Sequence, residues 1–445
     1  MKSRGIIHLV VSFFLAIQLL SGTGLMAADD AFLQQPNPWP EIRKQRIAQL
    51  LPRAMQTAQV DAWIILCREN RNDPLAEHIG CENAGAPAVF LFYLDAKGFH
   101  SRVYSPSSES TALADLAIHD QVIAVPRGES TLTQASSFIK NKNFKRIAVN
   151  SSTTNAQADG LSYTQRIALE EALGNAFAER LVSSQELVYQ WLSIKLPQEV
   201  AIMRAAAALT AKWQIEAYQQ VIPGTTTDAD VARFLKQKMA QYDVGDAWAP
   251  DQNPNVNSGP DRGHSHATDK VIMPGDVIQI DFGIRVFDRW VTDIQRFAYV
   301  LKPGETAAPA DIAHYWESAR LGGYRAFQAM RPGVTGIAVD RAQSVVMEAQ
   351  GSAPVMWSTG HPVGYVAHDT GPNLGGARGA TVRPAAQRPL KAGMVFAFDG
   401  FFAWTLPSGA QKTISVEEMA VITPDGAEYL IPPQQQLVLI PAAKK

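Results

Sequence analysis

Short apolar runs alternate with helical patterns over the first part of the chain. The runs predict strands because polar and turn-forming residues bound them, and they fall at 62–66, 88–94, 102–104, 122–125 and 146–149. Apolar residues at helical spacing lie at 42–58 and 163–173. Such alternation is typical of an α/β domain whose parallel or mixed sheet is covered by helices. We place this domain at residues 37–184.

The pattern changes after residue 184. Residues 185–192 predict a short connecting helix, and a new helix begins near Pro197. Proline suits the first helical turn, and acidic Glu199 suits the positive end of the helix dipole. Residues 185–197 are therefore the predicted linker, and residues 198–441 the predicted second domain.

The second domain shows an approximate internal repeat. Helical patterns at 198–220 and 228–242 precede one pair of apolar runs, and helical patterns at 310–330 and 336–349 precede a second group of strands. Two α-α-β-β halves packed face to face would bring both sets of strands to one central seam. The predicted fold class is therefore mixed α/β, with an α/β domain followed by this two-halved domain.

Each of the first two apolar runs of the second domain carries an acid. Asp281 lies in the run 275–283 and Asp293 in the run 291–297, and the short link between them predicts an antiparallel hairpin. A buried carboxylate without a partner is costly, and a bound cation relieves two of them. A hairpin whose acids face solvent is the alternative. Further candidate ligands downstream favour the metal site.

The charge balance directs attention to an internal site rather than to a charged surface. The 445 residues carry a formal net charge of −2. This value offers no electrostatic attraction for nucleic acid or for an anionic membrane. We therefore expect neither as a partner.

The first residues have the layout of a secretory signal peptide. Lys2 and Arg4 precede a largely apolar run at 6–20, and mostly small residues follow at 21–28. We predict a signal peptide at residues 1–28 that is removed on export, so that the mature protein is periplasmic or secreted and free of the membrane. An uncleaved anchor helix is the alternative.

The chain contains two cysteines, Cys67 and Cys81. In an exported protein such a pair can close a short loop with a disulfide, and two buried thiols are the alternative. Between the two cysteines lie three acids and a histidine, and we predict that they lie in a solvated loop: Glu69, Asp73, Glu77 and His78.

Candidate metal-binding and catalytic residues follow one another across the second domain. They are His264, Asp281, Asp293, His361, His368, Asp399 and Glu417. The motifs around them are Asp-Phe-Gly at 281–283, Thr-Asp-Ile-Gln-Arg at 292–296, Gly-His-Pro-Val-Gly at 360–364 and Val-Glu at 416–417. In this order they resemble the motifs of the pita-bread metallopeptidases. The first domain and the linker motif Leu-Ser-Ile-Lys at 192–195 resemble the branch that contains aminopeptidase P, prolidase and creatinase.

The resemblance implies a creatinase-like first domain, a pita-bread second domain and a metal centre. Two divalent metal ions would be held by Asp281, Asp293, His361, Asp399 and Glu417. Mn²⁺ is the expected metal because the ligands are mainly carboxylates, with Zn²⁺ or Co²⁺ as alternatives. His264 and His368 would face the substrate, and Asp399 would also take part in proton transfer.

The same resemblance implies an activity. Two metal ions close together generate a hydroxide nucleophile near neutral pH and polarise an amide carbonyl. The expected protein is therefore a metal-dependent aminopeptidase or dipeptidase that cleaves N-terminal bonds of small peptides, with Xaa-Pro bonds among the candidates. A homodimer is also implied.

Three residues depart from the family pattern. Asp399 stands where the family has a glutamate, Trp357 where aminopeptidase P and prolidase have a histidine, and Ser415 where they have an arginine. The alternatives are therefore a metal-free creatinase-like hydrolase of a small C–N substrate and a degenerate protein that binds without turnover. The five retained ligands favour the metal enzyme.

Overall fold

The computed structural model describes residues 30–70, 73–81, 87–263, 265–355, 357–375 and 382–442. The predicted signal peptide at 1–28 and His264 lie outside the described residues. Within the part of the chain that is described, none of the helices has the length and apolarity needed to span a bilayer.

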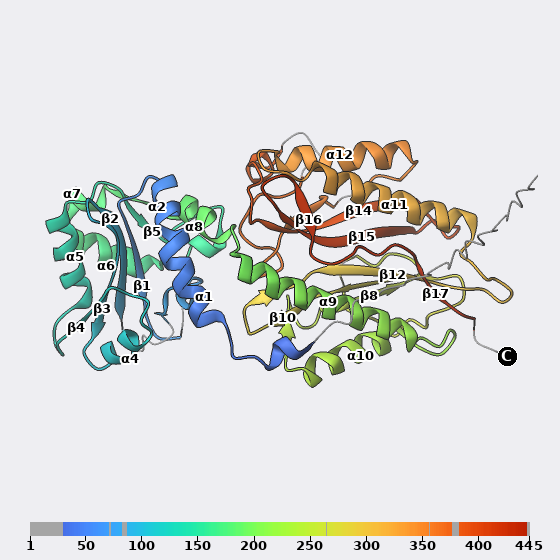
Figure 1. Ribbon diagram of the computed structural model, residues 1–445, viewed down its shortest axis with the longest axis horizontal. Helices are drawn as coiled ribbons and strands as arrows, with labels where there is room; N and C mark the ends of the chain where they lie inside the picture. Colours follow the sequence, from blue (N-terminus) through green and yellow to red (C-terminus); the bar gives the residue numbers. More distant parts are fainter. Residues whose placement is uncertain are drawn as a thin grey trace, which may run out of the picture.

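A six-stranded sheet forms the centre of the first part of the chain (Figure 1). In spatial order its strands are β4 (Gln121–Val125), β3 (Gly98–Pro106), β2 (Ala88–Asp95), β1 (Ala62–Cys67), β5 (Ile147–Val149) and β6 (Leu181–Ser183). Strand β1 pairs antiparallel with β2 and parallel with β5, so the sheet is mixed, as predicted. The short strand β6 is one that the apolar pattern does not reveal.

Helices cover both faces of this sheet (Figure 1). They are α1 (Trp39–Gln45), a π-helical stretch (Arg46–Leu50), α2 (Leu51–Thr57), α3 (Ala76–Ile79), α4 (Ser110–Asp115), α5 (Thr131–Lys142), α6 (Tyr163–Leu173), α7 (Asn175–Ala178) and α8 (Gln185–Leu192). All of β1 is buried, because Trp63 and Ile65 point into one core and Ile64 into the other. The predicted helix at 42–58 is present as α1 and α2, which the π-helical stretch joins.

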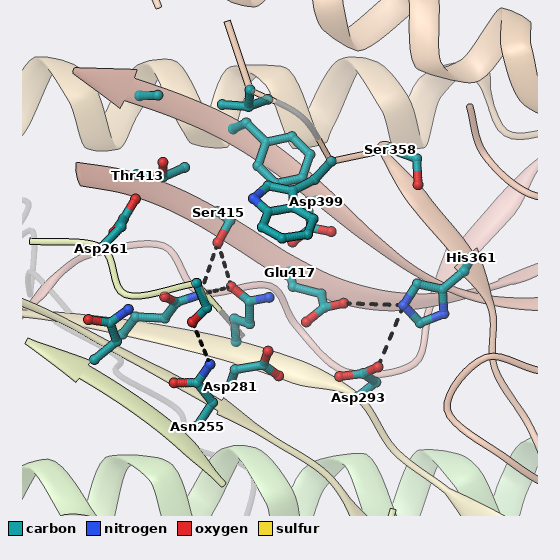
Figure 2. A pocket seen from close by; sticks show the side chains of 18 of the residues that line it. Asn255, Asp261, Asp281, Asp293, Ser358, His361, Asp399, Thr413, Ser415 and Glu417 are labelled. Atoms are coloured by element: carbon teal, nitrogen blue, oxygen red, sulfur yellow. Dashed lines mark hydrogen bonds and ion pairs between the residues drawn. The ribbon is translucent and has the colours of Figure 1, made fainter. Parts of the chain in front are cut away.

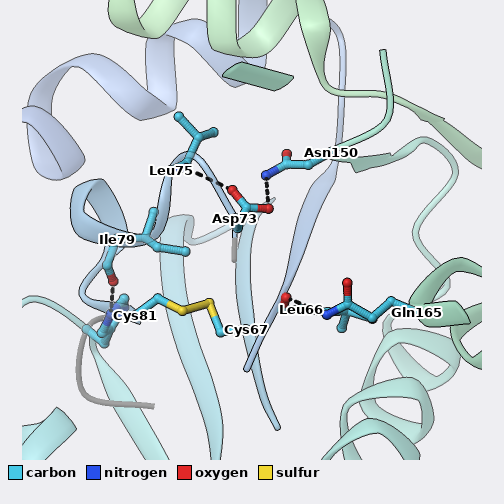
Figure 3. The surroundings of a disulfide bond; sticks show 9 residues. Leu66, Cys67, Asp73, Leu75, Ile79, Cys81, Asn150 and Gln165 are labelled. Carbon is cyan, nitrogen blue, oxygen red and sulfur yellow. Dashed lines mark hydrogen bonds between the residues drawn. A yellow bond between two sulfur atoms is a disulfide. The ribbon is translucent and has the colours of Figure 1, made fainter. Parts of the chain in front are cut away.

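A disulfide joins Cys67, at the end of β1, to Cys81, just beyond α3 (Figure 3). The prediction of a solvated loop at 69–78 is wrong for Asp73 and His78, which are buried, whereas Glu69 is exposed. Asp73 is buried and accepts hydrogen bonds from Asn150 Nδ2 at 2.8 Å and from Leu75 N at 2.9 Å. The apolar sequence around Asp73 is short, so the burial of Asp73 becomes evident only from its contact with Asn150, which directly follows β5.

Two four-stranded sheets and two pairs of helices form the second part of the chain (Figure 1). One sheet has the order β17 (Val438–Ile440), β12 (Ile294–Val300), β9 (Val277–Phe282), β8 (Asn255–Ser258), and the other has the order β13 (Gly360–Pro362), β14 (Val395–Thr405), β15 (Gln411–Ile422), β16 (Ala427–Tyr429). Strands β12 and β15 lie side by side, so the two sheets meet at a seam.

The helix pairs lie on the outer sides of the two sheets. They are α9 (Pro197–Gln219) with α10 (Asp228–Gln241), and α11 (Ala310–Ala329) with α12 (Gly336–Ala349). The capping sequence fixes the start of α10, because Thr227 Oγ1 accepts a hydrogen bond from Asp230 N. The predicted two α-α-β-β halves are thus confirmed, and the end of the chain adds β17 to the sheet of the first half.

The predicted hairpin that carries Asp281 and Asp293 is present, but the segment between its two strands forms strands of its own. Strands β9 and β12 are antiparallel, while the link forms a second hairpin of β10 (Ile284–Val286) and β11 (Trp290–Val291) that pairs with β7 (Gly245–Asp246). Gly283 lies between the end of β9 and the start of β10, where the chain leaves one sheet for the other. A Cβ there would overlap the Thr292 carbonyl oxygen, so only glycine allows the two chains to approach.

Candidate metal centre

One cavity of about 770 Å³ collects the predicted site residues between the two four-stranded sheets (Figure 2). Of the seven predicted residues, those among the described part of the chain all line it: Asp281, Asp293, His361, His368, Asp399 and Glu417. His264 lies outside the described residues, so its predicted role stays a prediction.

Regular strand positions fix the acids. Asp281 lies within β9, and Asp293 directly precedes β12, where the two strands meet in antiparallel register. Asp399 on β14 and Glu417 on β15 are direct cross-strand partners. Because residues on neighbouring strands that face each other point to the same side of a sheet, each sheet presents two acids to the cavity.

The tightest cluster joins both sheets. His361 Nε2 lies 3.6 Å from Asp293 Oδ2 and 4.0 Å from Glu417 Oε1. One ligand atom from each of these three residues lies within 4.8 Å of the other two. His361 occupies the short strand β13 and lies opposite Ala397 of β14, two residues before Asp399.

The four carboxyl groups of the site are not all ionised together near neutral pH, because the pKa of each is raised. Burial raises the pKa of Asp281 to about 7, and a hydrogen bond with Asp293 offsets part of that shift. Burial, followed by repulsion from neighbouring acids, raises the pKa values of Asp293, Asp399 and Glu417 well above their ordinary range. The four groups therefore need protons or cations to remain in this arrangement.

The site fits divalent cations. Asp399 Oδ1 and Glu417 Oε2 are buried, and neither accepts a hydrogen bond from any described residue. Carboxylate oxygens with one imidazole suit hard or borderline divalent ions. Glu418 is excluded, because it faces away from the cavity and accepts hydrogen bonds from Arg296, as the strand alternation predicts.

His368 lies at the edge of the cluster. Its ring packs on that of His361, with centroids 4.1 Å apart. Desolvation by the surrounding protein lowers the pKa of His368, so the ring is neutral near pH 7. A neutral imidazole that lines the cavity can accept a proton or donate a hydrogen bond to a bound group.

A hydrogen-bonded group of polar side chains borders the acids, and the sequence motifs gave none of its members a role at the metal centre. Ser415 Oγ and Gln279 Nε2 both donate to Gln295 Oε1, at 2.5 and 2.6 Å. A hydrogen bond from Gln295 offsets part of the burial and repulsion that raise the pKa of Glu417. The alternation of β9 and β12 could have located these residues, since Gln279 and Gln295 share a face with Asp281 and Asp293.

The rest of the cavity wall contains both apolar and polar side chains. Val355, Trp357 and Phe401 supply large apolar surfaces, and Asn255 and Gln411 supply amides. Trp357, at the position where the resemblance implies a histidine, is 40% exposed and lines this cavity. The cavity therefore offers hydrogen-bonding and apolar contacts around the acidic centre.

Comparisons with known proteins agree with this geometry. A family model described as metallopeptidase family M24 matches residues 201–424, just over half of the chain. A protein of Mycobacterium tuberculosis described as probable dipeptidase PepE is 24% identical over 291 residues, which cover 65% of this chain and 70% of that protein.

Solved structures share the fold over most of the chain. The dipeptidase PepE from Mycobacterium ulcerans superposes with a TM-score of 0.66 at 21% identity, covering 90% of this chain and 99% of that one. The X-Pro aminopeptidase from Thermotoga maritima gives 0.65 at 21% identity, covering 87% and 100%. The Xaa-Pro dipeptidase from Bacillus anthracis gives 0.66 at 19% identity, covering 89% and 100%. The predicted two-part pita-bread architecture is confirmed.

Proposed function

The chain belongs to metallopeptidase family M24, and from this premise we propose that it is an aminopeptidase or dipeptidase that uses two divalent cations to cleave short peptides. The observation that carries the proposal is the convergence of four buried acids and His361 on one cavity. Relatives described as a probable dipeptidase, an X-Pro aminopeptidase and an Xaa-Pro dipeptidase support short peptides as substrates, with Xaa-Pro bonds among them.

Five side chains would hold the cations. Asp281 and Asp293 would serve one ion and His361 and Asp399 the other, with Glu417 as the fifth ligand. When bound, two such ions lower the pKa of water at the site and polarise an amide carbonyl. Mn²⁺ is the proposed metal, because four oxygen donors and one imidazole suit it.

The remaining residues bind and orient the substrate. His368 presents a neutral ring to the cavity, where it can donate a hydrogen bond to a carbonyl or take up a proton. The apolar wall of Val355, Trp357 and Phe401 suits the side chain or ring of a bound residue and excludes water from the scissile bond. The family's glutamate is replaced by Asp399, whose carboxyl would serve as ligand and proton acceptor.

Metal content and peptide hydrolysis, measured together, test the proposal. The mature protein would be stripped with EDTA, loaded with Mn²⁺, desalted and analysed for metal, and then assayed on dipeptides and Xaa-Pro peptides. We expect two ions per chain, hydrolysis, and loss of both in Asp281→Ala and His361→Ala. His314→Ala is the matched control, because His314 is exposed on α11 and does not line the cavity. Hydrolysis without metal, or none in the loaded wild type, would overturn the proposal in favour of the creatinase-like or binding alternatives.

We also propose that the protein is exported. The sequence at 1–28 has signal-peptide character, and the Cys67–Cys81 disulfide is a bond typical of oxidising compartments. Mass spectrometry of protein from cell fractions tests this. We expect a periplasmic or secreted species that lacks the first residues and resists thiol alkylation, while a full-length, alkylated cytoplasmic species would contradict it. The homodimer stays a prediction, which sedimentation would test.

A further inference from the structure

A short segment carries both histidines of the site. His361 lies on β13, and the chain then runs without regular structure from residue 363 to residue 370, with His368 near its end. Among the described residues none forms a hydrogen bond with the His368 ring, which is positioned by its packing on His361 and by its own backbone. The position of His368 therefore depends on what holds this segment, which we call the histidine loop (363–370).

The Asp369 carboxylate holds the histidine loop from inside. It accepts hydrogen bonds from the loop's own backbone, Tyr365 N at 2.9 Å and Thr370 N at 2.7 Å. It also accepts from Lys195 Nζ at 3.1 Å and from Gln157 Nε2 at 2.9 Å. The carboxylate is fully buried, and such a charge is stable only when several donors surround it.

The two side-chain donors come from outside the loop and from different parts of the chain. Lys195 lies in the link before α9, and its backbone N is fixed to Gly393 O at 2.8 Å. Gln157 lies in the first domain, in the 3₁₀ helix Ala156–Ala158, 212 residues from Asp369 in sequence. The first domain thus reaches the residue next to His368 through one amide group.

Close packing fits the loop to these donors. A Cβ at Gly364 would overlap both the Lys195 side chain and the Asp369 carboxylate, so the loop has no room for a side chain there. Within its own domain, the loop is also bound by Val291 N, which donates to Gly364 O at 2.8 Å. This bond joins the loop to the segment that leads into Asp293.

A second contact ties the loop to the first domain. The Tyr365 hydroxyl donates to Glu199 Oε1 at 2.6 Å, and Arg46 Nη1 of the first domain donates to Glu199 Oε2 at 2.6 Å. Arg46, Glu199 and Tyr365 are all buried. Both Tyr365 and Asp369 are therefore held by groups that the first domain contributes or orders.

We propose that Gln157 and Asp369 are positioning residues, through which the first domain fixes the histidine loop and so holds His368 at the cavity. Neither residue lines the cavity, so both act through the loop rather than on the substrate. The catalytic part of this inference rests on the proposed peptidase function, whereas the anchoring part does not. The first domain thereby contributes to the site without contacting a bound peptide.

Hydrogen–deuterium exchange tests the anchoring without any substrate. Gln157→Met keeps the length of the side chain and removes its donor. We expect exchange of the peptide covering 363–370 to accelerate about threefold or more, with no change in other segments of the second domain. Gln185→Met is the matched control, because the Gln185 amide bonds to Ser152 and Thr154 instead. Unchanged exchange in 363–370, or equal acceleration throughout the protein, would overturn the inference.

Steady-state kinetics test the catalytic consequence. In Gln157→Met we expect kcat to fall about tenfold, with KM, metal content and melting temperature near those of the wild type, because only the geometry of His368 changes. In Gln157→Asn, whose amide is one methylene shorter, we expect a kcat between those of the wild type and Gln157→Met. A wild-type kcat in Gln157→Met, or a loss matched by lost metal, would overturn the role. A wild type that cleaves no peptide would refute the proposed function, and the exchange rates would still decide the anchoring.

Discussion

Asp399 on β14 lies directly opposite Glu417 on β15, so two buried carboxylates occupy one rung of an antiparallel ladder. Both side chains face the cavity (Figure 2). Burial makes both groups costly to ionise, and repulsion from neighbouring acids adds to that cost. A sheet gains nothing from such a pair unless a ligand binds there, and this expectation leads to tests of stability as well as of activity.

Replacing Glu417 by glutamine should stabilise the metal-free protein while it removes tight metal binding. The amide has the same shape but carries no charge among the neighbouring acids. We expect the free energy of unfolding at pH 8 to rise by about 1–2 kcal/mol. Denaturant unfolding in EDTA would measure this, and metal analysis would show the loss of bound ion.

Glu418→Gln is the matched control, one residue along the same strand. Glu418 accepts hydrogen bonds from buried Arg296 at 3.1 and 3.0 Å, so its loss leaves that cation without a charged partner. We expect a loss of about 3 kcal/mol. If both variants lost stability alike, Glu417 would be an ordinary structural acid and the metal assignment would fail.

The stability of the metal-free protein should fall as the pH rises from about 4 to about 7. The pKa of Asp281 is about 7 in the folded protein, while an aspartate in the unfolded chain has its ordinary pKa of about 4. Between these values the folded state binds more protons than the unfolded state, so stability decreases with increasing pH. The melting temperature in EDTA, measured from pH 5 to pH 8, should show this slope.

Metal should reverse that pH dependence. Cations bind the deprotonated carboxylates, so affinity rises with pH and adds stability where the metal-free protein loses it. Asp281→Asn should flatten the slope in EDTA and weaken the effect of Mn²⁺. A wild-type slope in this variant would show that other groups cause the pH dependence.

Local sequence signals predicted the four helices α9 to α12 of the second domain, but in the first domain they missed α4 and α5. Thr227 and Asp230 cap α10 at the expected residue, and Gly336 begins α12 where the apolar pattern starts. Strand β6 (Leu181–Ser183) escaped prediction because it has only two apolar residues, too few to show a pattern.

The sequence named six residues that line the cavity, but it did not give their geometry. Asp281 and Glu417 lie in apolar strands and Asp293 directly precedes one, so the alternation of the strands orders their faces and their convergence follows from the fold. The contact between Gln157 and Asp369 links residues 212 positions apart, and no periodicity encodes it. Pairings of this kind depend on how whole domains pack.

Lengthening Asp399 to glutamate should leave activity equal or higher. The backbone of Asp399 is fixed, since its N donates to Thr359 O at 2.7 Å, so only the reach of the carboxylate changes. We expect the affinity for the second metal to rise by up to about tenfold. Titration of the metal-free protein with Mn²⁺ would measure it, and Asp399→Asn should lose the site. A large loss of activity in Asp399→Glu would show that the cavity is built around the shorter acid.

Removing the Ser415 hydroxyl should weaken metal binding through Gln295. Ser415 Oγ and Gln279 Nε2 share the Gln295 carbonyl oxygen as acceptor, which turns the amide of Gln295 towards Glu417. In Ser415→Ala one of the two donors is lost, so the amide is less firmly oriented. We expect about a tenfold loss of Mn²⁺ affinity and about 1 kcal/mol of stability. Thr413→Ala is the matched control, because Thr413 lines the same cavity two residues earlier on β15. If the two variants bound Mn²⁺ equally well, Ser415 would have no part in holding Glu417, and its place near the metal centre would reflect substrate contact instead.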